Sequence, residues 1–514
     1  MDERIPRGSS HDDARGVEFA GWQRGEPGSY RSLLPARHPA SSWFRPRVLW
    51  ATRNDRLAHW LRDPTDRERR RWVAAQRAAG APADLVLRDH AELAEVSFLM
   101  LGDTGEGDAS QFVVVPPLLR MAEGARFMVI CSDVIYPAGD VDEYVPKFYF
   151  PYRDFPGPIY ALPGNHDWYD DLTSFMVHFC GAPPLPPEPE RPARLGSREW
   201  MRRLLWRRPK QASLAALAAG RALRPRDPAR SLQPASYFAI ETGPLLIVGI
   251  DTGITGGIDA EQARWLRAVS TASAKPKLLL TGRPIYYDGT YVPGAIEASA
   301  ETVDDIVCDP RANYVAVIGG DTHNYQRYPV RLPDGRTIQY LVSGGGGAFM
   351  HATHNIPRVA LPGVEEEEFR CYPLRGDSLS MYASNLGRRR RLAWLRVHPD
   401  AAAAVIAGRL GIEPVRGSAR RALGDGVSRR ERIVAGLVAT PPAPGRIVQR
   451  FFSEFFDWDH PPMFKSFLRL DATAAELRIR CFQATGWLRD ELDPPVEDQV
   501  RIPLAAGPVL RRAG

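Results

Sequence analysis

Four apolar runs in the central part of the chain each end in a turn that carries an acidic, amide or imidazole side chain. The run at 155–162 leads into the turn at 163–167, which contains Asn165 and His166. A run of this kind that stops at Pro-Gly is typical of a buried strand. The Asn165 amide oxygen can ligate a hard metal ion there, and the His166 imidazole can donate a proton.

The other three runs place comparable groups at the ends of strands. They are followed by Asp103, by Asp133 with Tyr136, and by Asp321 with His323. In an α/β sandwich the ends of parallel strands meet at one edge, so groups far apart in the sequence can converge. We therefore expect all four turns to surround a single site.

In this order the motifs resemble those of the calcineurin-like metallophosphoesterases, and within them the purple acid phosphatases. The matching segments are GDTG at 102–105, D-x-x-Y at 133–136, GNHD at 164–167 and GDTHNYQR at 320–327, a variant of the family's G-H-x-H. The resemblance implies an α/β (α+β) four-layer sandwich of two mixed β-sheets flanked by helices, here with helical insertions. It also implies hydrolysis of a phosphomonoester or phosphodiester by metal-bound hydroxide.

The resemblance also implies a dinuclear metal centre. One metal ion would be held by Asp103, Asp133, Tyr136 and His323, and the second by Asp133 and Asn165 together with further ligands. Asp133 would bridge the two ions, because a carboxylate offers one oxygen to each of two cations about 3.5–4 Å apart. Two interpretations of Tyr136 stay open: a phenolate ligand of the metal ion, or a half-buried aromatic ring whose hydroxyl makes a local hydrogen bond.

The chain departs from the family pattern at the second metal position. After the strand at 277–280 it has Thr281-Gly282-Arg283 where the family has a histidine, and Asp321 replaces the first histidine of G-H-x-H. In one account Asp321 donates an oxygen, which favours Fe, Mn or Mg over Zn there. In the other, Arg283 supplies the positive charge and grips phosphate oxygens. We favour Asp321 as a ligand.

The resemblance assigns His166 the role of protonating the leaving oxygen, with Asp167 orienting its imidazole. Arg283 is a further catalytic candidate. His351 and His354 follow a glycine run and are possible additional ligands or phosphate contacts, although structural roles are favoured for both.

The composition indicates which general class of protein this chain belongs to. The chain has 514 residues, 44% of them hydrophobic and 25% charged, which is ordinary for a soluble globular protein. No apolar run approaches the roughly 20 residues that span a bilayer, and the N-terminus lacks the apolar segment of a secretory signal. The five scattered cysteines favour reduced thiols and a cytoplasmic location. The net charge of +6 comes from arginines interleaved with acids, so no specific nucleic-acid binding is expected.

The sequence divides into segments of different character. We expect a disordered or extended segment at 1–40, a helical appendage at 41–91, the core at 92–350 with a basic, Pro-rich insertion at 181–233, a helical insertion at 351–462, a hairpin completing the core at 463–490 and a tail at 491–514. The insertion at 351–462 is expected to cap the site or to make an oligomer contact.

The basic insertion contains an amphipathic helix near 197–223, with tryptophans and leucines among arginines. We expect this helix to form a lid packed on the core. The more specific alternative is that it forms a surface that contacts a membrane or an anionic substrate. Three functions stay open: a phosphoesterase acting on a phosphorylated small molecule or lipid, a catalytically degenerate binding or scaffold protein, and a peripheral-membrane phospholipid phosphoesterase.

Overall fold

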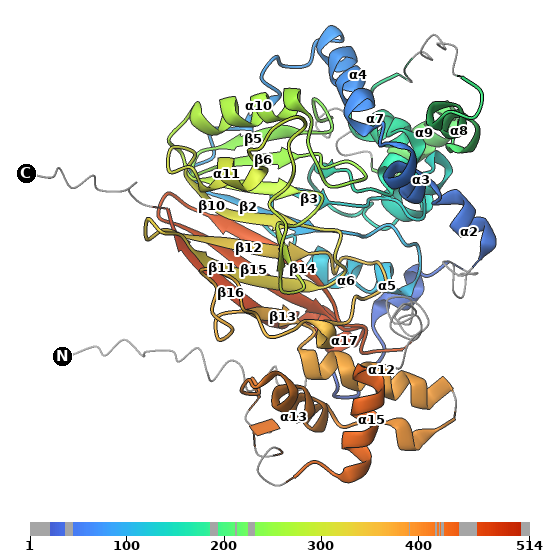
Figure 1. The fold of residues 1–514 in the computed structure, drawn as a ribbon, viewed down its shortest axis with the longest axis vertical. Helices are drawn as coiled ribbons and strands as arrows, with labels where there is room; N and C mark the ends of the chain where they lie inside the picture. Colours follow the sequence, from blue (N-terminus) through green and yellow to red (C-terminus); the bar gives the residue numbers. More distant parts are fainter. Residues whose placement is uncertain are drawn as a thin grey trace, which may run out of the picture.

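The computed structural model describes residues 21–35, 45–183, 185, 194–210, 213–224, 232–389, 391–416, 419–420, 422, 426–440 and 460–504. Two large sheets lie face to face in the middle of the molecule, and helices cover their outer faces (Figure 1). A two-stranded ribbon, β8 (Tyr286–Tyr287) with β9 (Thr290–Tyr291), lies outside them. The expected sandwich of two mixed sheets flanked by helices is confirmed.

The first sheet has eight strands. Its order is β1 (Val86–His90), β5 (Phe238–Thr242), β6 (Leu246–Ile250), β7 (Lys277–Thr281), β10 (Tyr314–Gly319), β12 (Thr337–Ser343), β11 (Tyr325–Arg331) and β13 (Arg370–Tyr372). Strands β6, β7, β10 and β12 run parallel, so their carboxyl ends share one edge.

The second sheet has six strands. Its order is β16 (Val496–Pro503), β15 (Glu476–Ala484), β14 (Lys465–Ala472), β2 (Val96–Leu101), β3 (Phe127–Cys131) and β4 (Ile159–Leu162). Strands β2, β3 and β4 are parallel and almost wholly buried. Both of their faces are covered, which explains why they read in the sequence as continuous apolar runs and not as alternating ones.

Three apolar clusters hold the layers together. One lies between the sheets and joins Phe98 and Val129 to Ile247 and Ile318. A second packs α5 (Ala109–Phe112), α6 (Val115–Arg120) and α7 (Thr173–Phe179) on the six-stranded sheet. A third packs α10 (Ala260–Thr271) and α11 (Val303–Cys308) on the eight-stranded sheet. Helix α10 begins after Asp259, whose carboxylate accepts from the amides of Glu261 and Gln262.

The sheets extend beyond the segment expected to form the core. Strand β1 comes from the expected appendage, β13 from the expected helical insertion and β16 from the expected tail, which also contains part of α17 (Leu488–Leu492). Within residues 21–35, Tyr30, in the short helix η1 (Ser29–Leu33), is buried, and the Ser29 amide donates to Glu491. The contact of Ser29 with Glu491 joins residues 462 positions apart, which local patterns do not encode.

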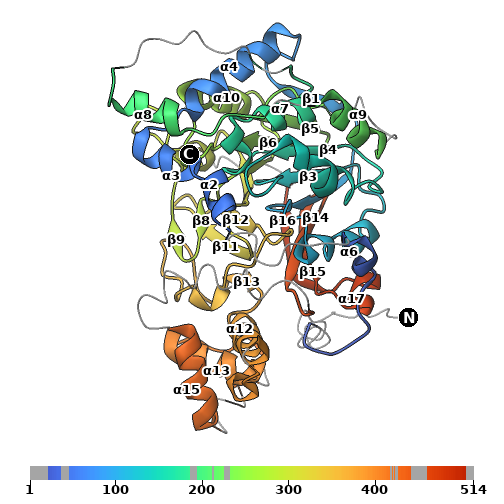
Figure 2. The same ribbon diagram turned by 90° about the vertical axis from the view of Figure 1, so that its right-hand side faces the viewer.

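The described part of the segment 351–462 contains α-helices as well as the strand β13. Helices α12 (Arg375–Arg389), α13 (Pro399–Leu410) and α15 (Arg429–Ala439) share a small core of their own that includes Leu379, Ile406 and Val434. This helical unit lies at one end of the molecule, beside β13 (Figures 1 and 2). Its role as a cap or an oligomer contact stays a prediction.

The remaining helices come from the N-terminal part and from the basic insertion. They are α2 (Pro46–Ala51), α3 (Asn54–Leu61), α4 (Thr65–Ala78), α8 (Arg198–Leu205) and α9 (Leu214–Ala222). Within the described ranges, no helix is both long and apolar enough to cross a bilayer.

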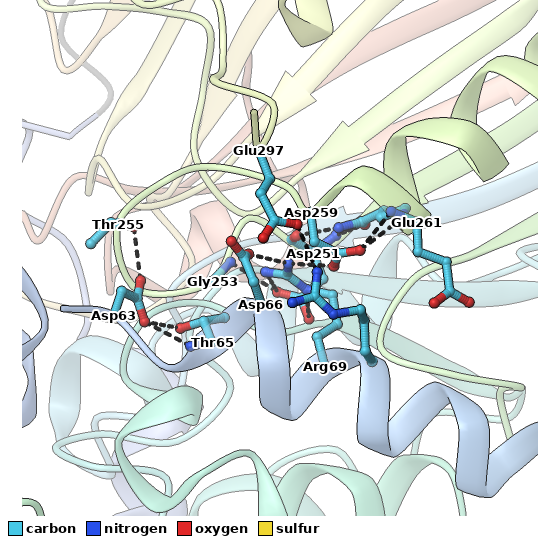
Figure 3. Close-up of polar contacts among 12 residues, drawn as sticks. Asp63, Thr65, Asp66, Arg69, Asp251, Gly253, Thr255, Asp259, Glu261 and Glu297 are labelled. Carbon is cyan, nitrogen blue, oxygen red and sulfur yellow. Dashed lines mark hydrogen bonds and ion pairs between the residues drawn. The ribbon is translucent and has the colours of Figure 1, made fainter. Parts of the chain in front are cut away.

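A buried ion cluster fastens α4 to the eight-stranded sheet (Figure 3). The fully buried guanidinium of Arg69 lies 3.1 Å from Asp251, which follows β6, and 2.9 Å from Asp259 at the start of α10. The Asp251 carboxylate also accepts from the indole of Trp168, 2.9 Å away. Burial by itself would lower the pKa of Arg69. The attraction of the two buried carboxylates outweighs this effect, so the pKa of Arg69 is raised.

Replacing Arg69 by alanine is expected to lower the free energy of unfolding by about 3–5 kcal/mol, because Asp251 and Asp259 would stay buried without a counter-charge. The matched control is the neighbouring Arg70→Ala, which removes an exposed ion pair with Glu297 and should cost less than about 1 kcal/mol. Urea unfolding of both variants measures the difference. Equal losses would show that the Arg69 cluster does not hold α4 in place.

Candidate active site

Both sheets end at a common edge, and the polar residues singled out in the sequence lie in the loops there. Asp103, Asp133 and the turn with Asn165 and His166 follow β2, β3 and β4 of the six-stranded sheet. The eight-stranded sheet supplies Arg283 after β7, Asp321 and His323 after β10, and His351 beyond β12.

Glycines allow the two sheets to approach closely at this edge. A Cβ atom on Gly102 would lie 2.6 Å from the carbonyl oxygen of Ser343 in the other sheet, and one on Gly320 would lie 2.3 Å from that of Cys131. The Cys131 thiol donates across the sandwich to the Thr281 carbonyl, 3.0 Å away. Any larger side chain at 102 or 320 would push the sheets apart and separate the loops.

The backbone is strained where the acidic residues sit. Asp103, Ser132, Asp133 and Asp321 have φ angles of 56°, 80°, 35° and 63°, a region that residues other than glycine rarely occupy. Backbone strain of this kind clusters at functional sites. Here the positive φ angles turn the chain sharply at the end of each strand.

The hydroxyl of Tyr136 lies at the centre of the polar cluster. It is 3.0 Å from Asp133 Oδ2, 3.3 Å from Asp103 Oδ1 and 3.1 Å from His323 Nε2. All four side chains are buried. The structure therefore brings together the complete set of side chains expected at the first metal position.

Main-chain contacts orient His323. Its Nδ1 lies 2.7 Å from the carbonyl oxygen of Phe349 and can only donate there, so in the neutral ring Nε2 carries the lone pair. Burial lowers the pKa of His323 well below its usual value. His351 stacks on this ring at 4.2 Å, and its Nδ1 accepts from the His323 backbone amide. His351 thus supports a site residue.

The cluster is short of positive charge and of protons. Burial and the neighbouring carboxylates raise the pKa of Asp103 well above its ordinary value, and burial and Asp321 raise that of Asp133 to about 7. One hydroxyl proton serves three acceptors, and Asp103 Oδ2 is buried with no hydrogen-bond partner among the described residues. A cation would meet these needs, and the carboxylate, phenol and imidazole donors suit a metal ion. Nevertheless, no three His, Cys, Asp or Glu side chains of the described segments are grouped closely enough to hold one.

The second metal position has a different composition. Arg283 Nε lies 3.6 Å from Asp321 Oδ2, and Asp321 raises the pKa of the guanidinium. The Thr252 hydroxyl accepts from the Arg283 backbone amide and holds this loop. Asn165 donates through Nδ2 to the Tyr169 hydroxyl, 2.6 Å away, which leaves the amide oxygen as its possible ligand atom. A cationic side chain therefore lies beside the carboxylate expected to bind the second metal ion.

The neighbours of His166 differ from those expected. Its Nδ1 lies 2.7 Å from the Pro137 carbonyl oxygen, so Pro137 takes the orienting role expected of Asp167. Asp167 is fully buried and accepts from the backbone amides of Val134, Ile135 and Gly164, which makes it a brace between two loops. Burial lowers the pKa of His166 to about 4.

His354 lies outside the cluster. Its Nδ1 is 2.8 Å from the Ser378 hydroxyl on α12, and its ring packs against Tyr382. This agrees with the structural role favoured for it. Sequence reasoning did not identify Pro137, Phe349 or Thr252, because they act through backbone atoms or a common hydroxyl that carries no motif.

Asp170, beyond His166 in the helix η4 (Asp167–Asp170), gives the structure a pH dependence. Burial raises its pKa to about 8, so the unfolded chain, with a pKa of about 4, releases the proton first as the pH rises. This contribution makes the free energy of unfolding fall between about pH 4 and about pH 8.

Asp170→Asn should remove this contribution, so its free energy of unfolding relative to wild type should rise with pH across that window. Urea unfolding at several pH values measures it. The control is Asp154→Asn, whose side chain is 67% exposed and which should parallel wild type. A wild-type-like profile for Asp170→Asn would contradict the prediction.

Comparison with known proteins gives a distant likeness in fold. No family model matches the sequence, and no curated protein matches it. Solved structures that resemble it include a purple acid phosphatase from yellow lupin (Lupinus luteus) seeds, at 12% identity over 80% of this chain with a TM-score of 0.37. PhoD matches at 9% identity over 82% of this chain and 73% of its own, with a TM-score of 0.33. TT1561 of Thermus thermophilus matches at 13% identity over 48% of this chain and 89% of its own, with a TM-score of 0.27. The match covers only 54% of the lupin enzyme, and scores this low carry no conclusion about function.

Proposed function

We propose that this protein is a metal-dependent phosphoesterase of the calcineurin-like type. The observation that carries the proposal is the convergence of Asp103, Asp133 and His323 on the Tyr136 hydroxyl, with contacts of 3.0–3.3 Å. The His166 ring lies 4.6 Å from the Tyr136 ring. Buried carboxylates short of a counter-charge, next to an imidazole, fit a site that combines a metal ion with an acid–base group.

Asp103, Asp133, Tyr136 and His323 would hold the metal ion. A metal ion in this position supplies Lewis acidity and lowers the pKa of a water molecule, which provides the nucleophile near neutral pH. The protein prepares the position in two ways: backbone strain sets the two carboxylates, and the Phe349 carbonyl fixes the His323 tautomer with Nε2 facing the cluster. Such supporting contacts orient ligands in metal sites generally.

At the second position we propose that Arg283 supplies the positive charge. Its guanidinium, beside Asp321, can form two parallel hydrogen bonds to a phosphate group. This reverses the preference drawn from the sequence, because the 3.6 Å contact already pairs Asp321 with a cation.

His166 is proposed to protonate the leaving oxygen. With a pKa lowered to about 4 it is neutral in the resting protein, and the Pro137 carbonyl keeps its proton on Nδ1. An anionic phosphate beside the ring would raise this pKa by favouring the charged form. The protonated Nε2 could then donate to the leaving group.

His166→Ala is expected to lower turnover of a phosphoester by about 10²–10⁴-fold while the bound metal is unchanged, because the ring moves a proton but is not a proposed ligand. Steady-state kinetics and elemental analysis of the same preparation measure both quantities. His398→Ala, which removes an imidazole 62% exposed on the helical unit, is the control and should keep wild-type turnover. Unchanged turnover in His166→Ala would remove this residue from the mechanism.

Elemental analysis of the purified protein is expected to find about one metal ion per chain, because Arg283 takes the place of the second. His323→Ala should lose this metal, while His398→Ala should keep it. Two equivalents in wild type would contradict the role given to Arg283. None, even after reconstitution with Mn²⁺ or Fe²⁺, would contradict the enzyme proposal and favour a fold retained for binding.

A further inference from the structure

Helices α2, α3 and α8 lie together on one side of the molecule, and both ribbon views show them as neighbours (Figures 1 and 2). Large apolar side chains point outward from them: Trp50 is 62% exposed, Trp60 62% and Leu204 66%. The guanidinium of Arg53 lies 4.4 Å over the Trp50 ring and donates to the Leu205 carbonyl, which ties α2 and α3 to α8. We call the exposed surface of 45–62 and 194–210 the aromatic–basic face.

Positive charge is concentrated on this face. The segments 45–62 and 194–210 contain 12 arginine and lysine residues but only two acidic ones, a net charge of +10, whereas the whole chain carries +6. The rest of the protein is therefore net negative. Arg202 and Arg203 pair with Glu199. Buried Arg207 pairs with Asp140, and Lys210 pairs with Asp140 and Asp142, which lie outside these segments. Arg47 and Arg56 are exposed and form no ion pair with any described residue. The face is thus complementary to an anionic surface.

The face borders the candidate active site. The Asn54 side chain on α3 donates to the Tyr169 carbonyl, 3.0 Å away, and the Tyr169 ring lies 4.8 Å from that of His166. Beyond α8, Arg207 Nη1 donates to the Ala138 carbonyl at 3.0 Å, next to Pro137, which holds the His166 ring. Both helices are therefore anchored to the loops that position His166.

Exposed tryptophan and leucine among arginines are typical of surfaces that lie in the headgroup region of a bilayer, where the ring and the aliphatic groups reach the acyl boundary and the guanidinium groups contact phosphates. Nucleic acid would also use arginine and aromatic rings. However, the exposed Leu49 and Leu204 have no flat face on which a base could stack. The combination favours lipid.

We propose that the aromatic–basic face docks this protein on an anionic phospholipid bilayer. Docking would bring the loops that position His166 next to the headgroups, so the phosphoester hydrolysed would be that of a membrane lipid. This last step rests on the proposed phosphoesterase function, whereas the docking itself does not.

Sedimentation of the full chain with phospholipid vesicles tests the docking without any measurement of turnover. The probes are vesicles of phosphatidylcholine alone and of phosphatidylcholine with about one-third phosphatidylserine. Wild type is expected to bind the anionic vesicles and to be released by salt. Arg47→Gln with Arg56→Gln should lower the partition coefficient by about 25-fold, on the basis of about fivefold for each arginine near the surface. Trp50→Ser with Trp60→Ser should also weaken binding.

The matched control comes from the helical unit at the other end of the molecule. Trp394 is 52% exposed and Arg429 is also exposed, so Trp394→Ser with Arg429→Gln removes the same chemistry elsewhere and should bind like wild type. Thermal unfolding of every variant shows that the fold is retained. Equal weakening by the control, or no preference of wild type for anionic vesicles, would overturn the proposal. Displacement of wild type from vesicles by a single-stranded RNA would do the same.

Activity assays separate this proposal from the phosphoesterase function. Both double variants on the face should hydrolyse a water-soluble phosphoester at the wild-type rate and a vesicle-borne phospholipid more slowly. Loss of lipid hydrolysis alone supports a lipid substrate. Wild type that binds vesicles but hydrolyses neither substrate would leave the docking in place and contradict the phosphoesterase function.

Discussion

The close burial of Asp103 and Asp133 around one phenol hydroxyl is the constraint on which the candidate site depends. Burial raises the pKa of both carboxyl groups, and the charge of Asp321 raises both further. The fold keeps them together because the two sheets approach closely at two glycines, Gly320 at the Cys131 carbonyl and Gly102 at the Ser343 carbonyl. The stability of the sandwich therefore maintains an arrangement that is unfavourable in the absence of a cation.

Backbone atoms set the functional histidines in this protein. Carbonyl oxygens of Pro137 and Phe349 accept from Nδ1 of His166 and His323, so both rings present Nε2. Asp167 contributes indirectly, because it binds the backbone amides of the loop that contains Asp133. The loops are thereby braced by main-chain contacts, so the positions of the His166 and His323 rings depend on the backbone of these loops.

The N-terminal helices are part of this bracing. Arg69 on α4 neutralises Asp251, and the next residue, Thr252, accepts from the Arg283 backbone amide. Asn54 on α3 holds Tyr169, beside His166. Segments that look like appendages in the sequence thus reach the same edge as the strand loops and join the candidate site to the aromatic–basic face.

The sequence by itself determined the strands and the groups that end them, because apolar runs bounded by Gly and Pro leave few alternatives to buried strands. It indicated Asp103, Asp133, Tyr136 and His323, and it located the hairpin of β14 and β15. Helix α10 could also be predicted, since Asp259 offers a local cap. These features depend on contacts within a few residues, which is why a single sequence reveals them.

Only the tertiary structure decided which distant groups become partners. The pairing of β1 with β5, the contact of Arg283 with Asp321, and the replacement of Asp167 by Pro137 beside His166 all join residues that carry no mutual signal in the sequence. The physical reason is that long-range pairing is selected by the shape and charge of the assembled core, where burial makes each unpaired polar group costly.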